Sequence, residues 1–184
     1  MIFYAEPKNK RFIKVVDWLD EEGKVRCSDH YNKYGYCYAR TIFNKKSKKV
    51  SKSYFDPEGK EIIVENFVTG DIVLNLENQT RIFKGRTEFV RFFFLSNGLE
   101  KCRIFFNSLS VPFFVSNSLP VQAGGRQDIL FWQEKTKDEI PGNMLLIFDG
   151  KANRCEKIIV QNHPSYERLL QLNAPETAMD ELGY

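Results

Sequence analysis

Histidines, closely spaced cysteines and long apolar runs are what this sequence of 184 residues lacks. It has only two histidines, His30 and His163, and its four cysteines form no Cys-x-x-Cys pair. A structural zinc site needs four ligands, usually with some at short spacing, so no metal site is expected. We predict that Cys27, Cys37, Cys102 and Cys155 are reduced, buried, small hydrophobic side chains, as is typical of a cytosolic protein.

Segments that would cross a membrane or direct secretion are also missing from the pattern. The longest apolar runs are short, such as residues 92–95, and residues 1–6 have neither the basic start nor the apolar stretch of a signal peptide. The net charge of +3 and the pI of about 8.6 are far from those of a dedicated nucleic-acid binder. We therefore expect a cytoplasmic globular protein with no nucleic-acid partner.

The familiar catalytic motifs are absent as well. The one glycine pair, Gly124-Gly125, precedes an expected strand, whereas a phosphate-binding loop follows a strand and opens a helix. The sequence contains no Asp-x-Asp, no two glutamates with seven residues between them and no Gly-x-Ser-x-Gly. We predict no catalytic residue and no cofactor held by this chain.

Turn signals recur every 12 residues in the first half of the chain. Asp or Asn at the first position of a type I turn caps it with the side chain, and Gly at the fourth position adopts the left-handed conformation. Four such turns are followed by a fifth at nearly the same interval: Asp20–Gly23, Asn32–Gly35, Asn44–Ser47, Asp56–Gly59 and Val68–Asp71. Ser47 departs from the pattern, because serine adopts the left-handed conformation less readily than glycine.

The runs between these turns are rich in β-branched and aromatic residues. Short turns between strands require antiparallel neighbours, so an extended meander of seven strands is expected, or eight if residues 3–5 also pair. The seven expected strands are Phe12–Leu19, Val25–Tyr31, Tyr36–Phe43, Val50–Phe55, Glu61–Phe67, Ile72–Leu76 and Thr80–Phe83.

Neither face of the meander reads as cleanly apolar, which favours an open sheet over a barrel or a sandwich. Strict alternation places Tyr36, Tyr38, Arg40 and Ile42 on one face, and Tyr54 belongs to the next strand. Tyr and Arg are enriched at protein interfaces, so Tyr36, Tyr38, Arg40 and Tyr54 are candidate partner contacts. Tyr and Arg also cover sheets with their amphipathic side chains, and that alternative stays open.

In the second half, helical and strand patterns alternate. Apolar strands alternating with helices predict a parallel sheet covered by helices, a Rossmann-like unit. The expected elements are a helix over 87–99, a strand over 103–107, a loop or short helix over 111–117, a strand over 128–132, a helix over 141–148, a strand over 157–161 and a helix over 164–172. The tail, residues 173–184, is either a further short helix or a frayed end.

Polar side chains follow each apolar strand of this unit. Ligands of open parallel sheets bind beyond the carboxyl ends of the strands. These positions, together with an expected helix start at 141–143, give eight binding candidates: Asn107, Ser108, Trp132, Gln133, Glu134, Asn143, Gln161 and Asn162. The alternative is that Asn and Ser only cap helices and form turns here.

A cluster of lysines surrounds one hairpin tip: Lys45, Lys46, Lys48, Lys49 and Lys52. Lysines that protect a sheet from aggregation are the simpler interpretation. The alternative is attraction to an acidic partner or to an anionic membrane surface.

Several long runs of the sequence resemble one protein family. They are Phe3–Asp20, Asp29–Gly35, Ser53–Asp56, Ile63–Ile72, Asp128–Glu134 and Asp138–Met144. On these runs, which span nearly the whole chain, the sequence resembles the GtfB-type stabilising subunit of the accessory Sec glycosyltransferase of Gram-positive bacteria. The chain is shorter than the family at both ends and resembles a fragment.

The resemblance implies a function. The family's partner is the catalytic GtfA-type subunit, and together they add N-acetylglucosamine from UDP-GlcNAc to Ser and Thr of serine-rich repeat adhesins. It implies a non-catalytic subunit that stabilises its partner and helps to hold the acceptor, with UDP-GlcNAc used by the partner. The alternative is a glycosyltransferase in its own right, represented here without its nucleotide-binding half.

The resemblance also implies a fold of mixed α+β and α/β character. Residues 1–84 would be the extended β-sheet domain, and residues 85–184 part of a Rossmann-like domain of the GT-B type. Because a parallel sheet that lacks its first strands leaves edges and apolar faces uncovered, we expect weak stability or self-association of residues 100–184 alone.

Overall fold

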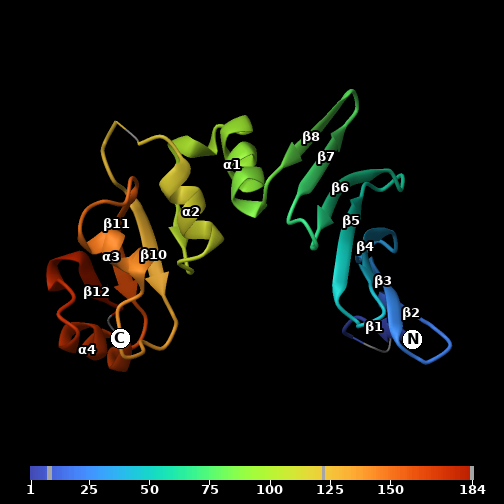
Figure 1. Cartoon of the computed structure of the whole chain (residues 1–184), viewed down its shortest axis with the longest axis horizontal. Helices are drawn as coiled ribbons and strands as arrows, with labels where there is room; N and C mark the ends of the chain where they lie inside the picture. The colour runs from blue at the N-terminus through green and yellow to red at the C-terminus, as the bar shows by residue number, and fades with distance from the viewer. Residues whose placement is uncertain (8–9, 122, 183–184) are drawn as a thin grey trace. The chain divides into compact units, whose positions relative to one another are not determined.

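The computed structural model describes residues 1–7, 10–121 and 123–182. The chain forms two compact units, Met1–Arg86 and Thr87–Tyr184. In Figure 1, the first unit is built of strands up to the point where the chain enters α1, whereas strands and helices alternate in the second unit.

The first unit is one antiparallel sheet of eight strands whose spatial order is their order in the sequence. This confirms the predicted meander and shows that the first short segment pairs as well. Its strands are β1 (Ile2–Tyr4), β2 (Ile13–Leu19), β3 (Val25–Tyr31), β4 (Cys37–Phe43), β5 (Lys49–Phe55), β6 (Glu61–Asn66), β7 (Ile72–Leu76) and β8 (Gln79–Phe83). Because β1 and β8 do not pair with each other, the sheet is open rather than closed into a barrel.

The hairpin turns form for the predicted reason. Asp20 Oδ1 accepts hydrogen bonds from the backbone N–H groups of Glu22 at 3.0 Å and Lys24 at 2.8 Å, and Gly23 has a φ of 78°. Ser47 occupies the corresponding position of its hairpin with a φ of 56°, a region that favours glycine. The fifth turn begins earlier than the predicted Val68–Asp71, because it is closed by a hydrogen bond of 2.8 Å from the Gly70 N–H to the Asn66 carbonyl.

Register shifts interrupt the alternation of faces near the hairpins. Between β3 and β4 the pairing passes from His30↔Ala39 to Tyr31↔Cys37, which leaves Tyr38 as the extra residue of a bulge. The Tyr38 ring lies 6.3 Å from the His30 ring, on the side of the sheet that also carries Ala39 and its partner Tyr54. The expectation that Tyr38 shares a face with Arg40 is therefore wrong.

The second unit contains a parallel sheet of four strands in the order β12-β11-β10-β9. The strands are β9 (Phe105–Phe106), β10 (Asp128–Trp132), β11 (Cys155–Val160) and β12 (Met179–Glu181), and the helices are α1 (Arg86–Ser96), η2 (Leu99–Lys101), α2 (Val111–Ser118), α3 (Gly142–Phe148), α4 (His163–Gln171) and η3 (Glu176–Ala178). The predicted parallel sheet is confirmed, and the tail supplies a short 3-10 helix and the fourth strand.

The core of the second unit lies on one face of this sheet. Leu130 and Ile158 are neighbours across β10 and β11 and are fully buried. They belong to one apolar cluster with Phe113 of α2, Met144 of α3 and Leu169 of α4. The helices that connect the strands therefore cover this face, whereas the alternate positions on the other face are only half-buried or exposed.

The cysteines differ from the expectation of four buried thiols. All four are free, but only Cys155 is buried, Cys27 and Cys37 are half-buried, and Cys102 is exposed. Burial raises the pKa of the Cys155 thiol to about 12, which keeps it protonated and unreactive at neutral pH. Within the described ranges, no helix has both the length and the apolar character needed to cross a membrane.

Candidate functional site

The carboxyl ends of the parallel strands place the predicted polar residues in two groups. Around the loop between β9 and α2, Ser108 Oγ lies 2.7 Å from Ser110 Oγ, and Asn143 of α3 donates from Nδ2 to the Leu109 carbonyl at 2.9 Å. Asn107 is exposed at the mouth of a small apolar cavity of about 310 Å³. Asn143 thus joins the start of α3 to the loop between β9 and α2.

The second group follows β10 and β11. Gln133 and Glu134 are exposed, Gln161 is half-buried, and the Gln161 N–H donates to the Trp132 carbonyl at 3.0 Å. The side chain of Trp132 itself is buried in the core, and its indole N–H has no hydrogen-bond partner among the described residues. Trp132 therefore does not offer its ring to a ligand at this edge, because it lies on the core face of the sheet.

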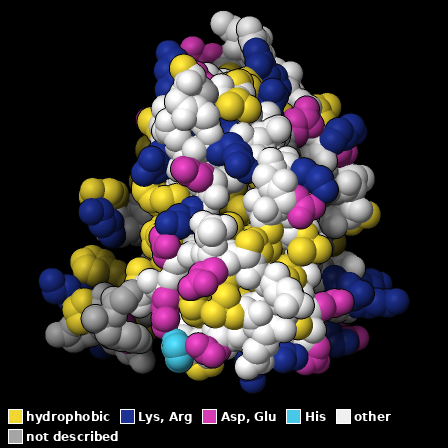
Figure 2. Space-filling model, turned by 90° about the vertical axis from the view of Figure 1, so that its left-hand side faces the viewer, with side chains coloured by type: hydrophobic (Ala, Val, Ile, Leu, Met, Phe, Trp, Pro, Cys, Tyr) yellow, Lys and Arg dark blue, Asp and Glu magenta, His cyan; other side chains and the backbone are white. Residues whose placement is uncertain are grey.

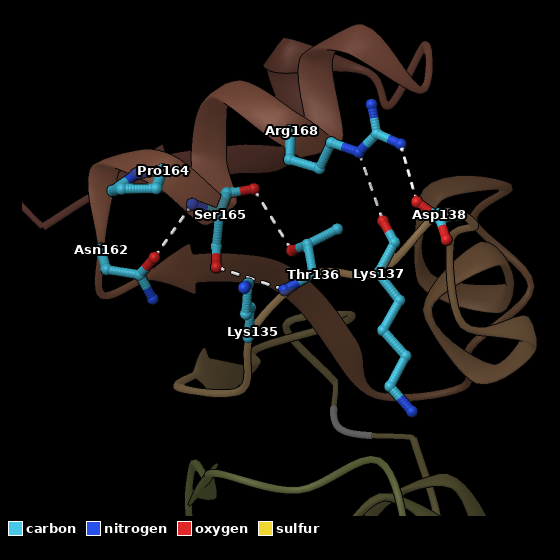
Figure 3. A pocket seen from close by; sticks show the side chains of 8 residues that line it. All are labelled: Lys135, Thr136, Lys137, Asp138, Asn162, Pro164, Ser165 and Arg168. Atoms are coloured by element: carbon cyan, nitrogen blue, oxygen red, sulfur yellow. Dashed lines mark hydrogen bonds and ion pairs between the residues drawn. The ribbon is translucent and has the colours of Figure 1, made fainter.

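A pocket of about 500 Å³ opens where the loop after β10 meets the start of α4. Figure 3 shows Asn162, Pro164, Ser165 and Arg168 on the side of α4, facing the four loop residues 135–138. Of the eight predicted residues, only Asn162 lines this pocket. The lining residues are Lys135, Thr136, Lys137, Asp138, Asn162, Pro164, Ser165 and Arg168.

Hydrogen bonds hold the walls of the pocket together (Figure 3). Asn162 Oδ1 accepts from the Ser165 N–H at 2.9 Å, so Asn162 caps α4. The buried hydroxyl of Ser165 accepts from the Thr136 N–H at 3.3 Å, and Thr136 Oγ1 donates to the Ser165 carbonyl at 3.3 Å. Arg168 reaches the Lys137 carbonyl at 3.3 Å and Asp138 Oδ1 at 3.2 Å. The loop is thereby fixed to the helix.

The chemistry of the pocket is polar and mildly basic. Three cationic side chains, Lys135, Lys137 and Arg168, share the lining with one carboxylate, Asp138. Such a lining can donate hydrogen bonds to carbonyl, hydroxyl or acidic groups. The sequence signal that was missed is the polar run 135–138, which begins directly after the predicted Gln133 and Glu134.

No arrangement for nucleophilic catalysis accompanies the pocket in the part of the chain that the structure describes. His163 begins α4, and its Nδ1 lies 2.9 Å from Glu181 Oε1 and its Nε2 lies 3.7 Å from Glu167 Oε1. Its ring nitrogens thus face carboxylates, whereas nucleophilic catalysis requires a base on a serine or cysteine. Residues 1–7, 10–121 and 123–182 contain no group of three metal-binding side chains.

The face of the molecule seen in Figure 2 carries basic and acidic side chains interspersed with hydrophobic ones. On this face, the mixture of both signs gives no extended field of one charge of the kind that a nucleic-acid surface requires.

The first unit carries a cluster of polar contacts on its sheet. Asp29 accepts from Arg40 Nε at 2.6 Å and Nη2 at 3.0 Å, and from Trp18 Nε1 at 2.9 Å. Burial alone would raise the pKa of Asp29, but the hydrogen bonds from Arg40 and Trp18 outweigh it and hold that pKa below its ordinary value. Of the predicted interface residues, Arg40 belongs to this cluster, while Tyr38 and Tyr54 lie on the opposite face.

The lysine-bearing hairpin tip is exposed at Lys45, Lys46 and Lys48. Lys49 lies 6.0 Å from the centre of the Phe67 ring, and Lys52 lies 4.9 Å from that of Tyr54. Two of the five lysines therefore lie over aromatic rings, Lys52 over Tyr54 of β5 and Lys49 over Phe67 of the turn after β6.

Comparison with family models covers nearly the whole chain. Residues 1–84 match the GtfB middle domain, and residues 86–172 match the GtfB third domain. The boundary between the two matches falls at the junction of the two structural units.

Curated relatives are stabilising proteins. The chain is 45% identical over 183 residues to the UDP-N-acetylglucosamine–peptide N-acetylglucosaminyltransferase stabilizing protein GtfB of Streptococcus agalactiae, covering 100% of this chain and 40% of that protein. It is 44% identical over 186 residues to the GtfB of Streptococcus gordonii, covering 100% and 41%. The chain thus spans about 40% of the length of the curated relatives it matches.

Solved structures agree with the sequence comparison. A crystal structure of a GtfA/B complex bound to UDP and GlcNAc matches with a TM-score of 0.83 and 40% identity, over 100% of this chain and 41% of that one. A crystal structure of accessory secretory proteins 1, 2 and 3 from Streptococcus pneumoniae matches with a TM-score of 0.63 and 15% identity, over 95% and 36%, and shares the fold.

Proposed function

Because this chain belongs to the GtfB family, we propose that it acts as a non-catalytic stabilising subunit for a GtfA-type glycosyltransferase. The complex would add N-acetylglucosamine from UDP-GlcNAc to Ser and Thr of serine-rich repeat adhesins. The names of the relatives and the GtfA/B complex with UDP and GlcNAc support this assignment. The observation that carries it is the open eight-stranded sheet, whose residues match the GtfB middle domain.

In this proposal the two units have separate tasks. Residues 1–84 form the extended sheet domain that docks the catalytic subunit through one of its two faces. The candidate contacts divide between these faces, with Arg40 on one and Tyr38 and Tyr54 on the other, and Tyr36 directly precedes β4. Residues 85–184 form part of a Rossmann-like domain of the GT-B type. The parallel order of β9 to β12 with connecting helices supports the second assignment.

The edge of the parallel sheet would hold the acceptor polypeptide. A Ser/Thr-rich unstructured segment offers hydroxyl and backbone groups, which the polar residues at this edge can bind by hydrogen bonds. The candidate contacts are Asn107, Ser108, Gln133, Glu134, Asn143, Gln161 and Asn162, joined by the pocket residues Lys135 and Arg168. The chain itself would bind no cofactor, and UDP-GlcNAc would be used by the partner.

The proposal is tested by mixing the chain with a GtfA-type subunit. We expect the two to co-elute in size-exclusion chromatography and the transferase to lose activity more slowly on warming when the chain is present. A control with bovine serum albumin at equal concentration separates specific support from crowding. Failure to co-elute, together with an unchanged rate of inactivation, would contradict the proposal.

The alternative function is a glycosyltransferase in its own right. It is favoured only by the α/β architecture of the second unit, which many transferases share. Incubating the chain alone with UDP-GlcNAc and a serine-rich repeat peptide, and measuring transfer by mass spectrometry, separates the two functions. We expect no added mass of N-acetylglucosamine without the GtfA-type subunit.

The complex would work in the cytoplasm, with the lysine-bearing hairpin tip touching the inner face of the membrane. The exposed Lys45, Lys46 and Lys48 support this contact, since basic clusters are attracted to anionic lipids. Flotation with vesicles that contain phosphatidylglycerol tests it. Recovery of the chain with the vesicles should fall when the three lysines are replaced by alanine.

A further inference from the structure

The sheet of the first unit carries an aromatic and a cationic side chain fixed by one buried carboxylate. The Asp29 side chain is 3% exposed and spans both partners, with Oδ1 on Arg40 Nε and Oδ2 on Trp18 Nε1 and Arg40 Nη2. The partners themselves are open to solvent, since Trp18 is 56% exposed and the Arg40 side chain 49%. Solvent therefore reaches the indole face and the far edge of the guanidinium.

Compared with an apolar pair in the same place, this arrangement adds little to the stability of the fold. Burying a carboxylate beside an arginine costs desolvation that the ion pair only partly offsets, and an apolar pair of similar volume is often as stable. What the carboxylate does supply is orientation, because it restricts the rotamers of two large side chains before any partner arrives. Side chains held in this way lose less entropy on binding, and Trp, Tyr and Arg dominate the binding energy of protein interfaces.

The exposed groups of this surface indicate which side chains a binding partner would present to it. The Nη1 group of Arg40 makes no hydrogen bond in the described part of the chain, and it points away from the edge that Asp29 occupies. A second carboxylate matches this donor best. Exposed Ile42 lies beside Cys27, which pairs with Trp18, so apolar surface adjoins the guanidinium.

We propose that the face of the sheet bearing Trp18, Asp29 and Arg40 is the face that docks the GtfA-type subunit. That subunit would present a carboxylate to Arg40 and an apolar side chain to Trp18. This inference rests on the proposed function and selects one of the two faces of the sheet. Asp29 acts as a positioning residue, and Trp18 and Arg40 make the contacts.

Complementarity argues against the other occupants. A second copy of this chain, related by a two-fold axis through the cluster, would bring two Arg40 guanidinium groups together without a free carboxylate. A Ser/Thr-rich acceptor offers neither the carboxylates nor the large apolar side chains that the face requires. Eight strands at the usual spacing give a face about 34 Å wide, which is enough for an interface of standard size with a folded subunit.

Five single variants of the full chain test the proposal by their affinity for the GtfA-type subunit in biolayer interferometry. We expect Trp18→Ala and Arg40→Ala to weaken binding roughly tenfold or more. Tyr38→Ala and Tyr54→Ala, on the opposite face, serve as matched controls and should stay within about twofold. Arg40→Lys keeps the charge but loses the planar fork, and we expect it to weaken binding nearly as much as alanine.

The outcomes separate this inference from the proposed function. If the wild-type chain does not bind the GtfA-type subunit, the proposed function fails and the docking face falls with it. The choice of docking face is wrong, while the proposed function stands, in two cases. In the first, the wild type binds and the Trp18 and Arg40 variants bind equally well. In the second, the Tyr38 and Tyr54 variants lose affinity instead. Circular dichroism and a thermal melt of each variant identify any that fail to fold. Trp18→Ala and Arg40→Ala form one pair, and Tyr38→Ala and Tyr54→Ala form the other. If one member of a pair does not fold, the affinity of the other member tests the face.

Discussion

At the scale of single residues, Asp29 gives the stability of the sheet a dependence on pH. Its folded pKa lies below the ordinary value, because hydrogen bonds from Arg40 and Trp18 outweigh the effect of burial. A carboxyl with a lowered folded pKa contributes stability above its unfolded pKa of about 3.9, and this is lost as pH falls through the folded pKa. We expect the free energy of unfolding of wild type to exceed that of Asp29→Asn at pH 7.

The same pair of proteins measured by urea unfolding between pH 7 and pH 3 completes the prediction. The difference between wild type and Asp29→Asn should narrow as pH falls below about 4, because Asp29 becomes protonated. Asp71→Asn is the control. The hydrogen bond from Lys84 at 3.1 Å also lowers the pKa of Asp71, but solvent screens this exposed pair, so the difference from wild type should stay small at every pH. A difference that stays constant over the whole range would contradict a lowered pKa.

Arg154 makes the second prediction at this scale. Its Nε lies 3.0 Å from Asp128 Oδ2, both side chains are buried, and its other nitrogens donate to the carbonyls of Glu100, Cys102 and Pro120. Replacing Arg154 by Met leaves the Asp128 charge buried without its cationic partner. We expect the free energy of unfolding of the second unit to fall by about 3–5 kcal/mol.

Chemical unfolding monitored by tryptophan fluorescence measures this loss, because Trp132 is buried in the second unit, whereas Trp18 of the first unit is already exposed in the folded state. Lys151→Met is the matched control, because Lys151 pairs with Asp149 at 2.7 Å in an exposed position. Surface pairs contribute at most about 1 kcal/mol, so this variant should stay close to wild type. If the free energy of unfolding fell equally in the two variants, the buried ion pair would contribute no more to stability than the exposed one, which would contradict the prediction.

The sequence predicted residue types at these positions but not their partners. Arg40 was a candidate contact from its type alone, whereas its pairing with Asp29, 11 residues away, depends on the register between β3 and β4. Trp132 was predicted at the sheet edge because it ends a strand. The direction of its side chain follows from strand parity, which places it with Leu130 on the core face.

At the scale of elements, the hairpin between β4 and β5 is the weakest member of the series. Ser47 has a φ of 56°, where Gly23, Gly35 and Gly59 occupy the same position in the other turns. A non-glycine residue in this conformation destabilises the folded state by about 1–2 kcal/mol. Glycine removes this strain but has a larger conformational entropy in the unfolded state, so only part of the strain energy is gained as stability. We expect Ser47→Gly to raise the free energy of unfolding of the first unit by about 0.5–1 kcal/mol.

Thermal unfolding followed by circular dichroism tests this change. The reverse substitution Gly59→Ser introduces the same strain at a φ of 83° and should lower stability by a similar amount. If both variants melt at the wild-type temperature, backbone conformation at this turn position does not limit the stability of the sheet.

Turn chemistry made the elements predictable where local residues decide them. Asp or Asn three residues before a Gly located three hairpins, and Asn44 before Ser47 located a fourth, which gave the antiparallel order of the strands. Bulges were missed, because a register shift such as that at Tyr38 depends on both strands of a pair. Strand β12 was missed for a related reason, since three residues pair with β11 only after α4 and η3 have brought them there.

At the scale of the whole molecule, the edge of the parallel sheet was predicted and its pocket was not. The rule that ligands lie beyond the carboxyl ends of parallel strands placed Asn162 correctly at the pocket. The remaining lining comes from the loop 135–138 and from Arg168, one and a half turns into α4. These residues meet only because hydrogen bonds tie the loop to the helix.

The parallel sheet of the second unit leaves one face with little cover, and this predicts self-association of the chain. Phe105 is 58% exposed on that face, where it contacts Phe131 with ring centres 5.9 Å apart. Sheets of parallel strands are normally covered on both faces, and exposed apolar surface at a sheet edge promotes association. We expect the full chain without its partner to sediment as a mixture of monomer and larger species at high concentration.

Phe105→Lys should shift this mixture toward monomer in sedimentation velocity experiments, because a charge on the exposed face makes its burial between copies costly. Phe12→Lys is the matched control, since Phe12 is exposed to a similar degree, at 52%, but belongs to the first unit. The open face would be ruled out as the cause if wild type sedimented as a monomer throughout, or if the Phe12 variant alone dissociated. Association that disappears with Phe105→Lys and persists with Phe12→Lys would locate it on the sheet of the second unit.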